Sequence, residues 1–324
     1  MKRTSLFRSF FMAALLFTSS FAFTSCEEDD DIAPVIEDTK VRGPYDQKGV
    51  FILNEGNYGT PNGSISFLSD STDHQVKNDI FGKANEDRPL GDVIQSMLLH
   101  DTLAYIVANN SNKIEVVHAF TFKTVAVVEN LKQPRYFVAL NGNKGYVTET
   151  VSYSSNGQVS VIDLKTNKVI KTLPVGAQPE QLLLYNGKLY VANNGGNTLT
   201  IINTATDAVE GTIETPDGPQ ALTLDKNNML WVLSNGKIVY KADWSGVDYT
   251  KTTAGALSQL NPANGTIVKT LPVASNQSAP GNLAANGVKD KLYYTYSGKT
   301  YELNITATAL PTTALIERSF KGLG

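Results

Sequence analysis

Few residues of this 324-residue chain have the spacing that enzyme chemistry needs. The three histidines, His74, His100 and His118, form no recognisable metal pair and no nucleophile–His–carboxylate set. With Cys26 as the single cysteine, an intrachain disulfide, a cysteine-based zinc site and an iron–sulfur cluster are excluded. We therefore expect no catalytic residue, no metal and no cofactor, and we predict that the protein is not an enzyme.

Three glutamates keep one catalytic alternative open. Glu55, Glu149 and Glu180 stand at the ends of apolar runs, where two of them could face one another. A facing pair of carboxyls can act as general acid and base in a glycosidase or a lactonase. The presence of carboxylates alone is weak support for catalysis, so we prefer a ligand-binding protein and keep a carboxylate-dependent hydrolase as the less favoured alternative.

Amide and aromatic side chains recur where the apolar runs end, and they suit binding better than catalysis. Asn and Gln both donate and accept hydrogen bonds, while Tyr and Trp add flat apolar surface with a polar tip. Asn and Gly are also ordinary turn residues, so any single position could be structural. As a set they predict a ligand-binding face made of Asn54, Glu55, Asn57, Tyr58, Asn109, Asn110, Gln133, Arg135, Glu149, Tyr153, Gln178, Glu180, Asn193, Asn194, Gln220, Asn235, Trp244, Tyr249 and Tyr296.

A repeated unit positions these residues. An apolar run, a polar turn and a second apolar run recur at 65–81, 114–130, 159–175, 199–215, 257–273 and, more loosely, 301–317. Each copy predicts a β-hairpin. A further strand precedes each copy, and a fourth apolar stretch precedes most of those strands, usually opening at a proline: Pro134, Pro179, Pro219 or Pro280. The repeat is therefore a unit of four strands.

Four strands in about 40 residues are typical of one blade of a β-propeller, in which blades pack face to face around an axis. No segment has a helical period over three turns. We predict an all-β propeller of four-stranded blades over 48–324. The sequence LYVANNGGNTLTIINTATDAVEGTIETPDGPQALTL at 189–224 resembles the YVTN or YncE-type β-propeller repeat. This resemblance implies the fold and says little about function.

The first and last units of the repeat are incomplete. Residues 49–81 supply three strands, and 321–324 match the start of a further inner strand. We expect a seven-bladed parent ring whose last blade is truncated in this chain, with a natural six-bladed ring as the alternative. An unclosed ring would leave the strand edge of the first blade open.

The fifth unit carries an insertion at 241–256, between its second and third strands. In a propeller this connection lies at the same end as the connections between blades. Long loops in repeat proteins are often functional, and this one contains Trp244 and Tyr249. We place the insertion on the ligand-binding face, with a tolerated surface insertion as the alternative.

The first 47 residues differ from the repeats. Residues 1–25 combine a basic start with an apolar run at 10–17, which is too short to span a bilayer. The sequence Phe-Thr-Ser-Cys ending at Cys26 resembles a bacterial lipobox, which implies cleavage after residue 25 and lipidation of Cys26. The acidic run at 27–31 resembles the surface-export signal of Bacteroidetes lipoproteins. Residues 26–47 would then be a lipidated tether on the outer membrane, exposed at the cell surface, with no other membrane contact.

Most of the difference between acidic and basic residues arises from this N-terminal region. Of 28 basic and 31 acidic residues, three basic ones lie in the predicted signal and five acidic ones in the acidic run, so the repeats are close to neutral. Nucleic-acid binding needs a basic excess, which is absent, so we expect no nucleic-acid partner. The ligand should be polar and largely uncharged.

The signal peptide, the FTSC sequence, the acidic run and NEGNYG at 54–59 are together similar to the BtuG cobalamin-binding lipoproteins of gut Bacteroides. This similarity implies capture of vitamin B12 or another corrinoid and its transfer to a BtuB-like TonB-dependent transporter. Cobalamin would be a transported ligand, with no protein ligand on cobalt because the binding face has no His. A glycan-binding lipoprotein that stacks sugars on Tyr58, Tyr153 and Trp244 is the main alternative. A scaffold that docks only a partner protein is another.

Overall fold

The computed structural model describes residues 42–317. The predicted signal peptide, Cys26, the acidic run and the predicted inner strand at 321–324 lie outside the described residues. The described chain is all-β apart from one short helix, and its strands form six separate antiparallel sheets. Within each sheet the strand order follows the chain, so each sheet is a meander of hairpins.

The first three sheets are blades 1, 2 and 3. Blade 1 holds β1 (Gly49–Asn54), β2 (Ser64–Ser69) and β3 (Val76–Lys77). Blade 2 holds β4 (Ile94–His100), β5 (Leu103–Ala108), β6 (Lys113–His118) and β7 (Thr124–Val128). Blade 3 holds β8 (Pro134–Asn141), β9 (Lys144–Glu149), β10 (Asn156–Asp163) and β11 (Lys168–Ala177).

The last three sheets are blades 4, 5 and 6. Blade 4 holds β12 (Pro179–Tyr185), β13 (Lys188–Asn193), β14 (Thr198–Asn203) and β15 (Ala208–Glu214). Blade 5 holds β16 (Pro219–Leu224), β17 (Leu230–Ser234), β18 (Ala256–Asn261) and β19 (Thr266–Pro272). Blade 6 holds β20 (Gly281–Ala285), β21 (Lys291–Tyr296) and β22 (Lys299–Asn304).

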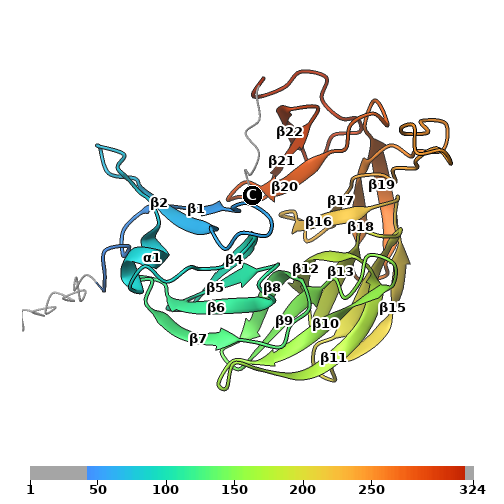
Figure 1. Cartoon of the computed structure of the whole chain (residues 1–324). Coiled ribbons are helices and arrows are strands. Elements are labelled where there is room, and N and C mark those ends of the chain that lie inside the picture. The colour runs from blue at the N-terminus through green and yellow to red at the C-terminus, as the bar shows by residue number, and fades with distance from the viewer. Residues whose placement is uncertain (1–41, 318–324) are drawn as a thin grey trace, which may run out of the picture. The chain divides into compact units, whose positions relative to one another are not determined.

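The blades are arranged as a β-propeller, which confirms the predicted fold class. The first strand of blades 2 to 6 lies innermost (Figure 1), and consecutive inner strands touch from β4 through β8, β12 and β16 to β20. The described ring has six blades, of which the first and last have three strands each. In blade 1 the edge of β1 that does not pair with β2 has no strand partner among residues 42–317.

The hydrophobic core lies between blades rather than within them. It divides into five clusters, and each cluster draws its buried residues from two consecutive blades. The second strand of blades 2 to 5 carries one large aromatic side chain that is almost fully buried: Tyr105, Tyr146, Tyr190 and Trp231. Two of these rings also bond to the next blade, since Tyr146 donates to Asp207 Oδ1 (2.5 Å) and Tyr190 to the Pro262 carbonyl (2.9 Å).

The repeat prediction is wrong in two places. The hairpin expected at 65–81 stops at Lys77, and the chain then forms α1 (Ile80–Ala84), whose Ile80 and Phe81 are buried. Asp79 caps this helix by accepting from the Gly82 amide (3.1 Å). The hairpin expected at 301–317 contributes only β22 in the described residues, and its second half makes a single bridge to Thr300.

Candidate functional site

Two sets of loops meet at one end of the propeller, as predicted. One set joins the second and third strands of each blade, and the other joins each blade to the next. The Gln133 backbone N–H donates to Asn112 Oδ1 (2.7 Å), and the side-chain Nε2 of Gln178 donates to the Tyr153 carbonyl (3.3 Å). These bonds connect loops of the two sets, so we define the 235–255 loop, its counterparts and the interblade loops together as the loop end.

Three of the predicted binding residues, Asn54, Glu149 and Asn193, each end a strand and bond to the next strand of the same blade. In each case the partners are alternate residues of the neighbouring strand. Asn54 Nδ2 donates to Ser64 Oγ (3.2 Å) and Ser66 Oγ (3.0 Å), and Asn193 Nδ2 donates to Thr198 Oγ1 and Thr200 Oγ1 (both 3.0 Å). Glu149 Oε1 accepts from Gln158 Nε2 (3.1 Å) and from Ser160 Oγ. Glu149 is 0% exposed and Asn193 is 1% exposed. The side chains of Glu149 and Asn193 therefore hold the blade together and do not face a ligand.

A polar chain links the start of three inner strands. Arg135 on β8 donates from Nε and Nη2 to the two carboxylate oxygens of Glu180 on β12 (3.0 and 3.1 Å). Its Nη1 also donates to Gln95 Oε1 on β4 (2.5 Å). Burial raises the pKa of Glu180, while the charge of Arg135 acts in the opposite direction. The sequence analysis missed Gln95, although it occupies the second position of its strand, as Arg135 and Glu180 do.

Most of the remaining amides hold the loops in place. Asn109 Nδ2 donates to the Pro134 carbonyl (2.9 Å) and Asn110 Nδ2 to Asp92 Oδ2 (2.5 Å). Asn194 Nδ2 donates to the Gly218 carbonyl (3.1 Å), which also accepts from the Asn235 backbone amide (2.8 Å). Tyr296 donates its hydroxyl to the Ser275 carbonyl (3.1 Å), and Gln220 is half-buried on β16. Their bonds make the loop end a preorganised surface.

The side chains left open to a ligand come from three loops: 55–63 between β1 and β2, and the loops between the second and third strands of blades 3 and 5. Glu55, Asn57 and Tyr58 project from 55–63, Tyr153 from 150–155, and Trp244 and Tyr249 from 235–255, and all six are exposed. Tyr58 and Trp244 are each 79% exposed, and Tyr153 is 72% exposed. The three rings offer flat apolar area that a ligand can cover.

The insertion in blade 5 is an ordered hairpin rather than a loose loop. Tyr240 and Val247 form a bridge, and the Tyr240 and Trp244 rings stack with centroids 5.8 Å apart. From the next interblade loop, Asn276 Nδ2 donates to the carbonyls of Tyr249 and Thr252 (both 2.8 Å). Beneath the hairpin is a small cavity of about 70 Å³, lined by Asn235, Ile238, Val247, Tyr249, Thr252, Thr253, Asn276, Gln277, Ser278 and Ala279.

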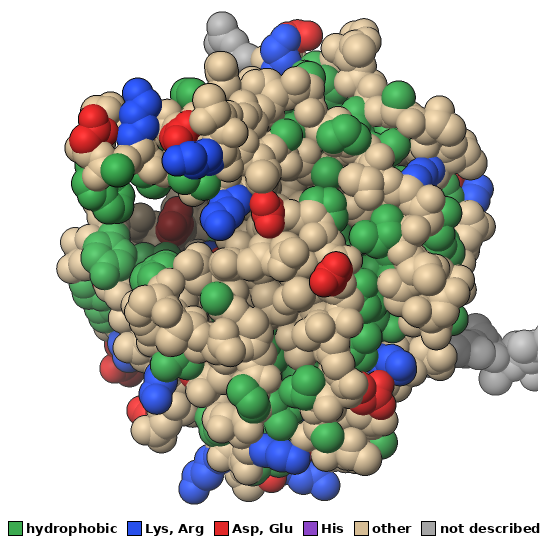
Figure 2. Space-filling model, turned by 90° about the vertical axis from the view of Figure 1, so that its right-hand side faces the viewer, with side chains coloured by type: hydrophobic (Ala, Val, Ile, Leu, Met, Phe, Trp, Pro, Cys, Tyr) green, Lys and Arg blue, Asp and Glu red, His purple; other side chains and the backbone are tan. Residues whose placement is uncertain are grey.

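A larger cavity of about 610 Å³ lies away from the loop end. It is bounded by the outer strand β15, including Glu210 and Ile213, and by the turn between β18 and β19 at 262–265. None of the predicted binding residues lines it. Figure 2 shows one side of the molecule, on which basic and acidic side chains, many of them next to one another, are distributed among uncharged polar and hydrophobic surface.

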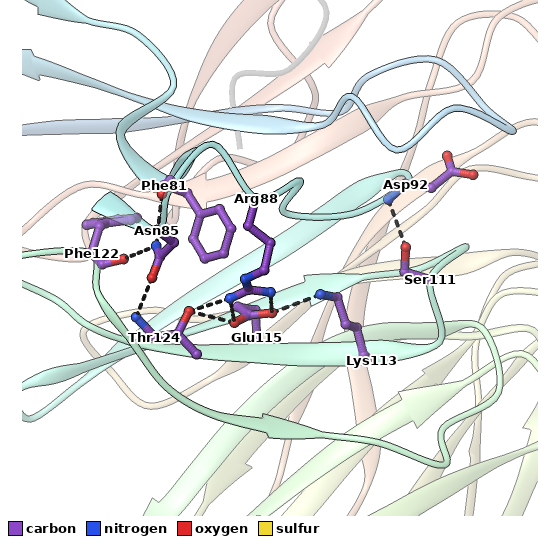
Figure 3. A network of polar contacts seen from close by, with 9 residues as sticks. All are labelled: Phe81, Asn85, Arg88, Asp92, Ser111, Lys113, Glu115, Phe122 and Thr124. Atoms are coloured by element: carbon purple, nitrogen blue, oxygen red, sulfur yellow. Dashed lines mark hydrogen bonds and ion pairs between the residues drawn. The ribbon is translucent and has the colours of Figure 1, made fainter. Parts of the chain in front are cut away.

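An ion network around the buried carboxylate of Glu115 braces blade 2 (Figure 3). Glu115 on β6 is 0% exposed and accepts from Arg88 Nη2 (2.6 Å), Lys113 Nζ (2.8 Å) and Thr124 Oγ1 (2.9 Å). Burial alone would raise the pKa of Glu115, but the hydrogen bonds from Arg88, Lys113 and Thr124 and the charge of Lys113 lower it below its usual value. Arg88 follows α1, so the network fixes the connection between blades 1 and 2.

The described residues contain neither a cluster of metal ligands nor a membrane-spanning helix. Residues 42–317 contain no group of three or more His, Cys, Asp or Glu side chains that could hold a metal ion. Within the same part of the chain, no helix has the length and apolar character needed to cross a membrane.

Comparison with known proteins identifies the fold and leaves the ligand open. The sequence profile of a domain of unknown function, DUF5074, matches residues 48–320, and no curated protein matches the sequence. A candidate 6-phosphogluconolactonase from Bacteroides fragilis is 13% identical with a TM-score of 0.56, over 79% of this chain and 77% of that one. BamB from Moraxella catarrhalis is 14% identical with a TM-score of 0.49, over 83% and 75%. At these identities the likeness is one of fold alone.

Proposed function

Because the chain belongs to the DUF5074 family, a domain of unknown function, we propose its activity from the loop end itself: capture of cobalamin or a related corrinoid. The supporting observation is the set of exposed rings on three loops, Tyr58, Tyr153 and Trp244, standing among amide side chains on a nearly neutral surface. A corrinoid is wide, fringed with amides and partly apolar. Amides and tyrosines offer it both hydrogen bonds and flat contact area.

We place this capture at the cell surface. The chain would be an outer-membrane lipoprotein anchored through Cys26, and it would pass the corrinoid to a TonB-dependent, BtuB-like transporter. The support is the lipobox and the acidic run at 27–31, which lie outside the described residues. The protein would act as a binding protein, without turning its ligand over and without a metal or cofactor of its own.

We also propose that the parent ring has seven blades. Its support is the unpaired edge of β1, where Val50 is 57% exposed and Ile52 is 39% exposed. The same positions in β5 are Ala104 and Ile106, which are fully buried and flanked by an inner strand. A further strand would fit along β1.

Isothermal titration with cyanocobalamin, set against a panel of polysaccharides, tests the function. We expect saturable binding of cyanocobalamin at one site and no heat from the polysaccharides. Because the binding face has no His, the absorption spectrum of the bound corrinoid should show no protein ligand on cobalt, and a His-ligated spectrum would contradict that part of the proposal.

A glycan-binding lipoprotein is the second candidate, and the exposed Trp244 is the observation that favours it. An indole at 79% exposure can stack on a sugar ring as well as on other planar groups. Polysaccharide binding without any cyanocobalamin binding in the same titration would establish this candidate and reject the first.

A further inference from the structure

The Tyr240–Trp244 stack has features that go beyond an exposed loop. Trp244 adopts a left-handed backbone conformation (φ 58°), which is strained for a bulky residue. One face of its ring stacks on Tyr240 with an interplanar angle of 29°, while the side chain remains 79% exposed. The strained backbone at Trp244 therefore leaves one face of the indole open to solvent while Tyr240 covers the other.

The stack is held in a fixed position relative to the rest of the loop end. Thr253 Oγ1 donates to Asp217 Oδ2 in the loop before blade 5 (2.9 Å), and Asn276 in the loop after blade 5 bonds to two carbonyls of the insertion. The hairpin closes through the Asp248 amide to the Val239 carbonyl (2.7 Å). A platform anchored on both sides loses little freedom when it binds a ligand.

Two lysines add positive charge to the same loop. Lys237 and Lys241 are exposed, and neither forms an ion pair with a carboxylate in the described part of the chain. Lys251, also in this loop, is by contrast paired with Asp248 (3.4 Å). A planar ring surface in the same loop as unpaired ammonium groups suits a ligand that joins a flat base to an anion, as a nucleotide does.

We propose that the Tyr240–Trp244 stack binds the nucleotide part of the corrinoid, with the planar base on the open face of Trp244 and the phosphodiester near Lys237 and Lys241. This inference rests on the proposed function and specifies which part of the ligand the blade 5 insertion contacts. The corrin ring itself would lie on the other loops, which carry Tyr58 and Tyr153.

The test compares cobalamin with cobinamide, a corrinoid that lacks the base, ribose and phosphate. In the purified protein, Trp244→Ala should weaken cobalamin binding by roughly 5- to 150-fold, the range expected for losing one stacked base, and leave cobinamide binding unchanged. Trp244→Phe keeps a ring and should retain most of the cobalamin affinity. As the control, Val268→Ala removes another exposed apolar side chain: Val268 lies on β19 and is 58% exposed. This change should alter neither affinity.

The lysines give a second, independent measurement. A double variant, Lys237→Gln with Lys241→Gln, should weaken cobalamin binding and flatten its dependence on salt, because an exposed charge pair is screened. Cobinamide binding should again be unaffected, since it has no phosphodiester.

Any other result contradicts the inference, and the combination of affinities for the two corrinoids shows which proposal is wrong. If Trp244→Ala weakens both corrinoids equally, or neither, the stack does not recognise the nucleotide, while the proposed function stands. If the unmodified protein binds neither corrinoid, the proposed function fails and the inference falls with it. Loss of polysaccharide binding in Trp244→Ala, in a protein that binds no corrinoid, would reassign the stack to sugars.

Discussion

At the scale of single residues, hydrogen bonds to a neighbouring strand separate the polar side chains that build blades from those that can meet a ligand. Asn54 and Asn193 each reach two hydroxyls placed two residues apart on the neighbouring strand, as in Thr198 and Thr200. Side chains two residues apart share one face of a strand, so both hydroxyls lie within reach of one amide. The Ser-x-Ser and Thr-x-Thr pairs are visible in the sequence and could have marked these amides as structural.

Glu149→Gln tests this separation. The carboxylate of Glu149 accepts from Gln158, Ser160 and the Lys132 backbone amide, whereas a glutamine would place donors against these donors. We expect a loss of about 1–3 kcal/mol in the free energy of unfolding, measured by urea denaturation, with corrinoid affinity unchanged in the folded fraction. Glu55→Gln is the matched control, because Glu55 is exposed and its change should leave stability unaltered. A loss of turnover on some substrate in Glu149→Gln, without a loss of stability, would instead favour the hydrolase alternative.

Arg88→Met tests the buried network around Glu115. Removing one of two cationic partners should cost about 2–3 kcal/mol of unfolding free energy, less than the loss of a whole buried pair because Lys113 and Thr124 remain. Because the pKa of Glu115 is lowered in the folded protein, its stabilising effect is present above the carboxyl's unfolded pKa and is lost as the pH falls through the lowered value. The variant should therefore lose part of the pH dependence of stability below about pH 5. Lys168→Ala, an exposed substitution on β11, should show the unmodified pH profile.

At the scale of elements, the repeat made most strands predictable. Prolines open β8, β12 and β16 as expected, and β20 begins one residue after Pro280, because the chain turns into an inner strand at these points. The helix α1 could not be predicted, since five residues show no helical period and its start depends on Asp79 in a left-handed conformation (φ 48°). The stacking of Trp244 on Tyr240 also needed the structure, because the bridge at Tyr240 folds the insertion back on itself.

Asn276→Ala tests what orders the insertion. The variant loses both bonds that tie the 235–255 loop to the next interblade loop, so the hairpin should open locally more often. We expect faster cleavage within this loop in limited proteolysis, with the melting temperature of the propeller nearly unchanged. Gln277→Ala changes the neighbouring exposed residue, whose side chain has no such bonds, and should be cleaved at the original rate. Equal cleavage of the two variants would show that Asn276 does not order the loop.

At the scale of the whole molecule, we expect membrane attachment and ligand binding to depend on different parts of the chain. Cys26, the proposed lipidation site, precedes the described residues 42–317 in the sequence. We expect Cys26→Ala to move the protein from the membrane fraction to the soluble fraction, with corrinoid affinity unchanged, as measured by fractionation and titration. Retention in the membrane fraction would contradict lipid anchoring, whereas a loss of affinity would mean that the anchor segment takes part in binding.

The division of the core into clusters shared by consecutive blades has a consequence for how the molecule opens. Blades 2 to 5 each contribute to two clusters, while blade 1 packs only into the first and blade 6 only into the last. Such a chain of nearest-neighbour couplings unzips from its ends. In native-state hydrogen exchange, amides of β9 and β13 should be the slowest, and those of β1 and β22 should be released at free energies well below that of global unfolding. The terminal blades would then open locally while blades 3 and 4 stay folded, so ligand contacts made by Tyr153 in blade 3 would outlast those made by Tyr58 in blade 1.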